Sequence, residues 1–128
     1  MNSCAKYSGK MLTVGRVLIG LFFLFGGISK LMDPTGTAEY MSAYGLPAAS
    51  ILVWVVAIFL IIVAGALIVG RCVCTCAALL AVFTILATLI FHTDFAGDEL
   101  QIFFFTKNVA ILGGLLLLMG GCSGNCKE

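Results

Sequence analysis

Three cysteines alternate beside an arginine in the stretch "RCVCTCAALL", residues 71–80, where a polar turn gives way to an apolar run. Arg71 and the positive N-terminal end of a helix would both stabilise thiolate, which makes these sulfurs candidates for redox chemistry. Three further cysteines lie near the ends of the chain, at Cys4, Cys122 and Cys126. The Cys-x3-Cys spacing in "GCSGNC" is within the range of zinc ligands.

The sequence is consistent with two kinds of role for these cysteines, one chemical and one structural. In a helix Cys72 and Cys76 lie on nearly the same side, whereas Cys74 points away. Free cysteine is also a small hydrophobic residue at home in a membrane helix, and cysteines near a membrane are sites of acylation. We expect the candidate redox thiols, which are also the candidate ligands of zinc or copper, to be Cys72, Cys76, Cys122 and Cys126.

A second group of polar residues is predicted to gather at the other end of the spans. Lys30 and Lys107 fall inside apolar segments, where a charge is costly and marks a binding site or a partner. Asn108 follows Lys107, and His92 can exchange a proton near neutral pH. The plainer role of the lysines is to reach the lipid headgroups and fix the helix register. The candidate quinone or anion site is Lys30, His92, Lys107 and Asn108.

Composition identifies the solvent of this chain as lipid. Its 128 residues are 62% hydrophobic and 10% charged, against roughly 45–50% and about 25% in soluble domains. This length predicts a single domain, 1–128, and a net charge of +1 argues against a nucleic-acid partner. The apolar runs have the roughly 20 residues that a helix needs to cross a bilayer. The expected spans are 11–32, 48–70, 72–92 and 103–121, between tails 1–10 and 122–128.

The fold class predicted is therefore all-α, an integral membrane four-helix bundle. The first span lacks an Ala-x-Ala cleavage site at its end, so we expect it to be retained and not removed as a signal peptide. The connection that follows it, residues 33–47, predicts a short helix lying in the membrane interface, with Thr37 as a possible cap. Tyr40 and Tyr44 are four residues apart and would share one face of that helix.

Lysine and arginine counts predict the orientation. With four spans, both termini and the turn at Arg71 lie on one side, which carries five lysines and arginines against two on the other. Positive loops stay in the cytoplasm, so both termini are expected inside, in a bacterial inner membrane. All six cysteines then face the reducing cytosol and are expected to remain unbridged. With the termini outside, structural disulfides would be the natural expectation.

Small residues predict the helix contacts, because close backbone approach stabilises helix association in lipid. The third span, with four such residues at helical spacing, is the expected central helix. The predicted contact positions are Gly20 and Gly27 in the first span, Ala57 and Gly65 in the second, Ala77, Ala81, Thr84 and Thr88 in the third, and Ala110, Gly113 and Gly114 in the fourth.

Five stretches carry a family resemblance that runs from about Gly15 to Gly120. Arg16 is followed by "GLFFLFGGISKLMD", "YMSAYGLPA", "GALIVG", "FHTDFAG" and "FTKNVAILGGLLLL". The Gly-x-Ser-Lys end of the first span and the Lys-Asn-x-x-x-x-Gly-Gly opening of the last are the most specific parts. This chain resembles the DoxX family of small four-helix membrane proteins.

The resemblance implies two classes of function. The family's name member is similar to the small membrane subunit of a thiosulfate:quinone oxidoreductase, and others work with thiol and sulfur redox partners or as membrane chaperones. We therefore expect a membrane subunit that passes electrons from a thiol or sulfur donor to quinone together with a soluble or membrane partner protein. The alternative is a non-enzymatic anchor, chaperone or soft-metal protein, and a homo-oligomer is compatible with both.

One departure from the family limits what can be transferred. Many members carry a glutamate in the second span ahead of its glycines, whereas this chain reads "AIFLIIVAG" at residues 57–65. No role of that carboxylate applies here. The cysteines are likewise outside the general family pattern, so their roles rest on their own chemistry.

Overall fold

Five helices make up the part of the chain that a computed structural model describes, namely the backbone of residues 2–91 and 99–121 and the side chains of residues 9–90 and 102–121. No strand occurs in these ranges. The helices are α1 (Asn2–Met32), α2 (Pro34–Ala43), α3 (Ala49–Val69), α4 (Val73–Phe91) and α5 (Glu99–Gly121).

Four of these helices are long and apolar enough to cross a membrane, as predicted. The spanning segments are Gly9–Met32, Ala49–Val69, Val73–Ile90 and Ile102–Gly121. The chain is thus an integral membrane protein with an all-α four-helix bundle, and the short α2 lies between the first two spans. Helices α1 and α5 begin earlier than the expected spans, at residues 2 and 99, because helical backbone continues beyond the apolar runs.

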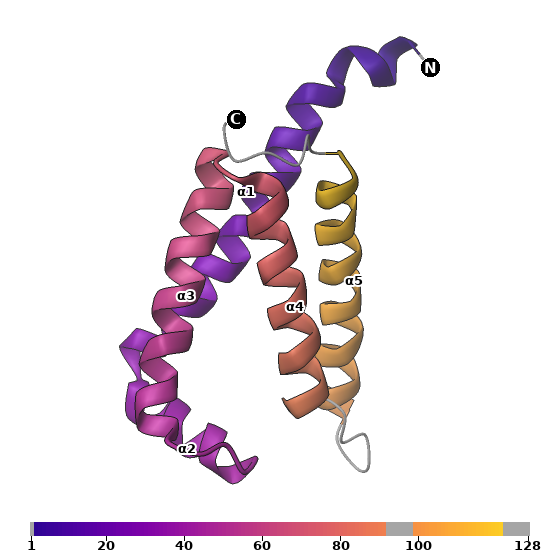
Figure 1. Ribbon diagram of the computed structural model, residues 1–128. Coiled ribbons are helices and arrows are strands. Elements are labelled where there is room, and N and C mark those ends of the chain that lie inside the picture. Colours follow the sequence, from indigo (N-terminus) through magenta and orange to yellow (C-terminus); the bar gives the residue numbers. More distant parts are fainter. Residues whose placement is uncertain (1, 92–98, 122–128) are drawn as a thin grey trace.

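The bundle is closed at one end and opens at the other. Helix α1 packs mainly against α3, α4 packs mainly against α5, and α3 contacts α4. The turn between α3 and α4 lies at the same end as the start of α1 and the end of α5, and α2 lies at the opposite end, where α3 and α4 diverge (Figure 1). The two helix pairs are therefore joined near the α3–α4 turn and spread apart towards α2.

Glycines of α1 set the close approach to α3. A Cβ atom on Gly20 would lie 2.5 Å from the Ile68 side chain and 3.3 Å from the Ala64 carbonyl oxygen, and one on Gly27 would lie 3.1 Å from the carbonyl oxygen of Ala57. Ala57 and Ala64 are fully buried. The prediction for Gly20, Gly27 and Ala57 is confirmed.

Three other predicted contact positions are wrong. A Cβ atom on Gly65 would have nothing within 4 Å, because the face of α3 that meets α1 passes through Ala64, one residue earlier. On α5, Gly113 is equally open and Ala110 is exposed. Of the three positions predicted on α5, only Gly114 makes a close contact, because a Cβ atom added to it would lie 3.1 Å from the Ile19 side chain.

The prediction that α4 is the central helix is wrong, because in the described part of the chain α4 contacts α3 and α5, whereas α3 contacts α1, α2 and α4. The small residues of α4 are nevertheless buried, since Ala77 is fully buried and Ala81, Thr84 and Thr88 are 5–6% exposed. The two threonine hydroxyls donate to carbonyl oxygens one turn earlier, Thr84 to Leu80 at 2.7 Å and Thr88 to Thr84 at 2.6 Å. These bonds satisfy the hydroxyls without a partner helix, so both threonines are tolerated in an apolar core.

Arg16 joins α1 to the end of α3. Gly70 ends α3 in a left-handed conformation with φ of 88°, and its N–H and that of Arg71 donate to carbonyls of the last turn. The Arg16 guanidinium Nη1 donates to the carbonyl oxygens of Leu67 at 2.7 Å and Ile68 at 2.9 Å. A cation at a helix C-terminus interacts favourably with the helix dipole and with carbonyls that have no partner inside the helix.

Helix α2 has a defined start. Asp33 is its N-cap and accepts a hydrogen bond from the Gly36 N–H at 3.0 Å, with Pro34 in the first turn. The cap is thus Asp33 and not Thr37, because Pro34 is favoured at the first helical position. Tyr40 and Tyr44 lie on one face as expected, with ring centroids 5.0 Å apart.

The α1–α3 contact makes a testable prediction. Replacing Gly27 with leucine places a side chain against the α3 backbone and should lower the free energy of unfolding in detergent by about 2 kcal/mol. Gly15→Leu is the matched control, because Gly15 is on the same helix with nothing within 4 Å of an added Cβ atom. Equal losses in the two variants, measured by denaturant titration, would show that α1 and α3 do not meet at Gly27.

Candidate functional site

A cavity of about 540 Å³ lies inside the open half of the bundle. All five helices contribute to its wall, which is mostly apolar, with Phe22 and Phe83 among the rings. Three polar residues from the predicted quinone or anion site, Lys30, Lys107 and Asn108, line this cavity together. The fourth, His92, lies outside the described residues. Three of the four predicted residues, from segments far apart in the chain, thus line one cavity, together with other polar residues that were not predicted there, Ser29, Thr37, Tyr40 and Thr84.

Lys107 is held against two aromatic rings. Its Nζ atom lies 5.1 Å from the ring centroid of Phe22 on α1 and 4.8 Å from that of Phe104 on α5. A cation over an aromatic face is attracted by the ring quadrupole. The ammonium is thereby fixed at the wall of the cavity between α1 and α5.

Lys30 has a much weaker attachment. Its Nζ atom donates only a long hydrogen bond, 3.4 Å, to the Gly26 carbonyl of its own helix. An ammonium carries three donors, so the described residues leave most of the donors of Lys30 unused. In the described parts of the chain neither Lys30 nor Lys107 makes an ion pair with a carboxylate.

Asn108 is oriented by the threonines of α4. Its Nδ2 atom donates to the Thr88 hydroxyl at 3.0 Å. Because that hydroxyl already donates its proton to the Thr84 carbonyl at 2.6 Å, it can only accept from Asn108, which fixes the amide with Nδ2 towards α4. The Oδ1 atom of Asn108 remains as an acceptor at the cavity wall.

The cavity is bordered by side chains that face lipid. Phe22, Leu86 and Ile90 line it and are each 39–55% exposed in the isolated chain. At the other side of the opening, Thr37 and Tyr40 of α2 reach the wall. A ligand with an apolar tail thus has a route from the bilayer, and sequence reasoning missed the part that α2 plays in this wall.

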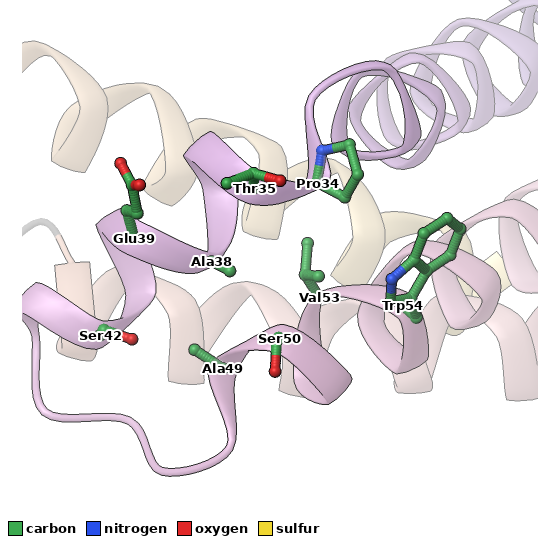
Figure 2. Close-up of a pocket in the computed structure, with 9 residues that line it drawn as sticks. All are labelled: Pro34, Thr35, Ala38, Glu39, Ser42, Ala49, Ser50, Val53 and Trp54. Atoms are coloured by element: carbon green, nitrogen blue, oxygen red, sulfur yellow. The ribbon is translucent and has the colours of Figure 1, made fainter.

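A separate hollow between α2 and the start of α3 has a different character. It is shallow and includes Glu39, Ser42 and Trp54. Figure 2 shows that Glu39 and Trp54 lie at opposite ends of it and that its polar side chains do not converge on one point. Although its volume, about 620 Å³, exceeds that of the cavity, it offers no set of groups for binding or chemistry.

The described cysteines lie at the closed end of the bundle. Cys72 and Cys74 each take part in a disulfide, whereas Cys76 is a buried free thiol that is 3.5 Å from the Arg71 carbonyl oxygen. The expectation of unbridged thiols is therefore wrong for Cys72 and Cys74. Cys122 and Cys126 lie outside the described residues, as does the side chain of Cys4.

The three described cysteines lie in different surroundings. Cys72 precedes α4 in a left-handed conformation with φ of 49°, and Cys74 is 3.7 Å from the Met119 carbonyl oxygen near the end of α5. Cys76 points into the main apolar core, as the small-hydrophobe reading expects. Among the residues that the structure describes, no group of three or more potential ligands could hold a metal ion.

The two candidate sites are well separated. Along α4, Cys74 and the nearest cavity residue of that helix, Phe83, are nine residues apart, which is about 14 Å at 1.5 Å per residue. The described cysteines therefore lie outside the cavity, towards the closed end of the bundle.

Comparison with known proteins agrees with this architecture. The chain is 32% identical over 108 residues to "Inner membrane protein YqjF" of Escherichia coli K12, covering 82% of this chain and 78% of that protein. It is also 32% identical over 113 residues to "Inner membrane protein YphA" of the same organism, covering 84% and 80%. No solved structure matches the chain.

The sequence model of the DoxX family matches residues 11–93, from the start of the first span through α4. The family resemblance noted in the sequence is thus confirmed, and this chain belongs to the DoxX family.

Proposed function

We propose that this chain is the quinone-binding membrane subunit of a thiol or sulfur redox system in a bacterial inner membrane. One observation carries the proposal, namely the apolar cavity that opens towards lipid and has Lys30, Lys107 and Asn108 in its wall. Binding sites for small molecules are mostly apolar with a few convergent polar groups. A quinone, with its apolar ring and tail and two carbonyl oxygens, matches that chemistry.

Each polar group has a role in this proposal. The ammonium groups of Lys30 and Lys107 donate hydrogen bonds to quinone oxygens, and such charge-assisted bonds are the strong ones. The Oδ1 atom of Asn108, left available by the bond to Thr88, accepts a hydrogen bond from a hydroxyl of the reduced quinol. Phe22 and Phe83 flank the ring, and the tail extends past Leu86 into the bilayer.

The overall reaction needs a partner protein. Two thiols and one quinone give one disulfide and one quinol, so two electrons and two protons move from sulfur to the ring. Thiol–disulfide exchange requires direct attack of one sulfur on another. Since Cys74 is about 14 Å along α4 from the nearest cavity residue of that helix, Phe83, the described cysteines do not reduce the quinone directly, and the partner supplies the electrons at the cavity end.

Quinone binding tests the proposal. Lys30→Met and Lys107→Met should each weaken binding of a short-chain quinone to the purified protein in lipid nanodiscs by about tenfold or more, because each removes a charged donor. Lys10→Met is the matched control, since Lys10 is an exposed lysine of α1 away from the cavity. The measurement is equilibrium dialysis. Wild-type protein that binds no quinone, or variants that bind as well as wild type, would refute the proposal.

A second function, a non-enzymatic anchor or chaperone, is favoured by a different observation. Cys72 and Cys74 are disulfide-bonded, and disulfides in the cytosol are rare unless they are catalytic or redox-sensing. A structural disulfide fits an orientation with both termini outside, and a redox-active one fits the orientation that the lysines and arginines favour. A soft-metal site through Cys72 requires that its disulfide first be reduced, because the thiolate is the ligand.

The orientation that we propose places both termini, and with them the Cys72 end, in the cytoplasm. In intact cells treated with a permeant reductant, a bulky membrane-impermeant maleimide should then leave Cys72 and Cys74 unmodified, and opened cells should show labelling of both. Cys76→Ser is a suitable background, since its thiol is buried. Labelling in intact cells would place this end outside and assign the disulfides a structural role.

A further inference from the structure

The cavity has a net positive charge that nothing in its described wall neutralises. Lys30 and Lys107 both line it, and no aspartate or glutamate does. The described carboxylates nearest in sequence are used elsewhere, because Asp33 caps α2 and Glu39 is exposed in the separate hollow beside α3. Two cations in an apolar site without an acidic partner are costly unless an anion joins them.

A neutral ligand offsets this cost only in part. A quinone oxygen accepts hydrogen bonds from an ammonium but adds no charge. The interaction of unit charges strengthens as the surrounding dielectric falls, so an anion between two ammonium groups in this cavity gains far more than it would in water. Among the three redox states of a quinone, the neutral quinone and quinol lack that gain and the semiquinone anion has it.

We infer that Lys30 and Lys107 make this a site for the semiquinone anion, so that the bound quinone is reduced in two separate one-electron steps. This inference rests on the proposed function. In the first step the quinone takes one electron from a one-electron carrier of the partner protein, a flavin or metal centre that the two thiols reduce, and becomes the radical anion beside the two ammonium groups. In the second it takes another electron and two protons and leaves as the neutral quinol, which both lysines hold less tightly.

The other contacts of the two lysines fit this role. Lys107 is kept at the wall by Phe22 and Phe104, which leave its charge uncompensated because rings carry none. Within the described residues, Lys30 is held by a single 3.4 Å bond to Gly26, so it can turn towards an anion without breaking a strong interaction with them. The amide of Asn108, fixed by Thr88, adds no charge and serves only to orient the ring.

The experiment is a redox titration of quinone-loaded protein in nanodiscs, with dithionite as reductant and electron paramagnetic resonance as the readout. Wild type should show a radical whose semiquinone formation constant exceeds that of free quinone in the same lipid by at least about tenfold. Lys30→Met and Lys107→Met should each lower it about tenfold or more, Lys30→Arg should retain most of it, and Lys10→Met should leave it unchanged.

The outcomes separate this inference from the proposed function. Quinone that binds but gives no more radical than free quinone, or Lys→Met variants with the wild-type constant, would overturn the inference and leave the quinone site standing. Absence of quinone binding in wild type would overturn both. Folding of each variant is checked by its thermal unfolding in the same nanodiscs.

Discussion

A charge inside a membrane span must find a partner, and that constraint separates the cations of this chain into two kinds. Arg16 has its partners within the protein, the carbonyl oxygens of Leu67 and Ile68 at 2.7 and 2.9 Å. These carbonyls belong to the last turn of α3, where the Leu67 oxygen also accepts from the Gly70 N–H at 3.2 Å. Among the described residues, Lys30 and Lys107 have only a long bond and aromatic rings as partners. The first cation therefore holds the fold together, and the other two are retained at a cost that a ligand would offset.

The two kinds of cation also lie at different ends of the molecule. Near the α3–α4 turn, Arg16 and Gly20 bring α1 against α3, and Cys74 approaches the end of α5. Towards α2 the helix pairs spread apart and enclose the cavity between them (Figure 1). A closed end fixes the relative positions of α1, α4 and α5, and these are the helices that carry Lys30, Thr88 and Lys107. In this way packing at one end of the membrane positions the polar groups at the other.

Much of this arrangement could be predicted from the sequence, because membrane burial leaves a strong signal. Charge-free runs identified the four spans, and small residues identified the α4 core at Ala77 and Ala81. The lysines stood out because charges are rare in such runs. Finer features depended on helix rotation, which composition does not encode. Gly65 was expected at the contact that Ala64 makes, and the bond from Asn108 to Thr88 needed the actual position of α5 beside α4.

The disulfide bonding of Cys72 and Cys74 could not be predicted from the sequence, for a different reason. The sequence placed these sulfurs at one membrane face but carried two opposing indications of the compartment, since positive residues favour the cytosol and paired cysteines favour an oxidising space. The sequence did place the cysteines and the two lysines at different ends of the spans, and Cys74 and the cavity residue Phe83 lie nine residues apart on one continuous helix.

Unfolding free energies of the ligand-free variants Arg16→Met, Lys30→Met and Lys107→Met, measured side by side by denaturant titration in the same detergent, test this division most directly. The account predicts that Arg16→Met loses about 2–4 kcal/mol, since it removes charged hydrogen bonds to two carbonyls in a partly buried position. Lys30→Met and Lys107→Met should stay within about 1 kcal/mol of wild type or be more stable, as expected for residues kept for binding. Losses in both lysine variants as large as that of Arg16→Met would contradict it, because the lysines would then be part of the structural framework.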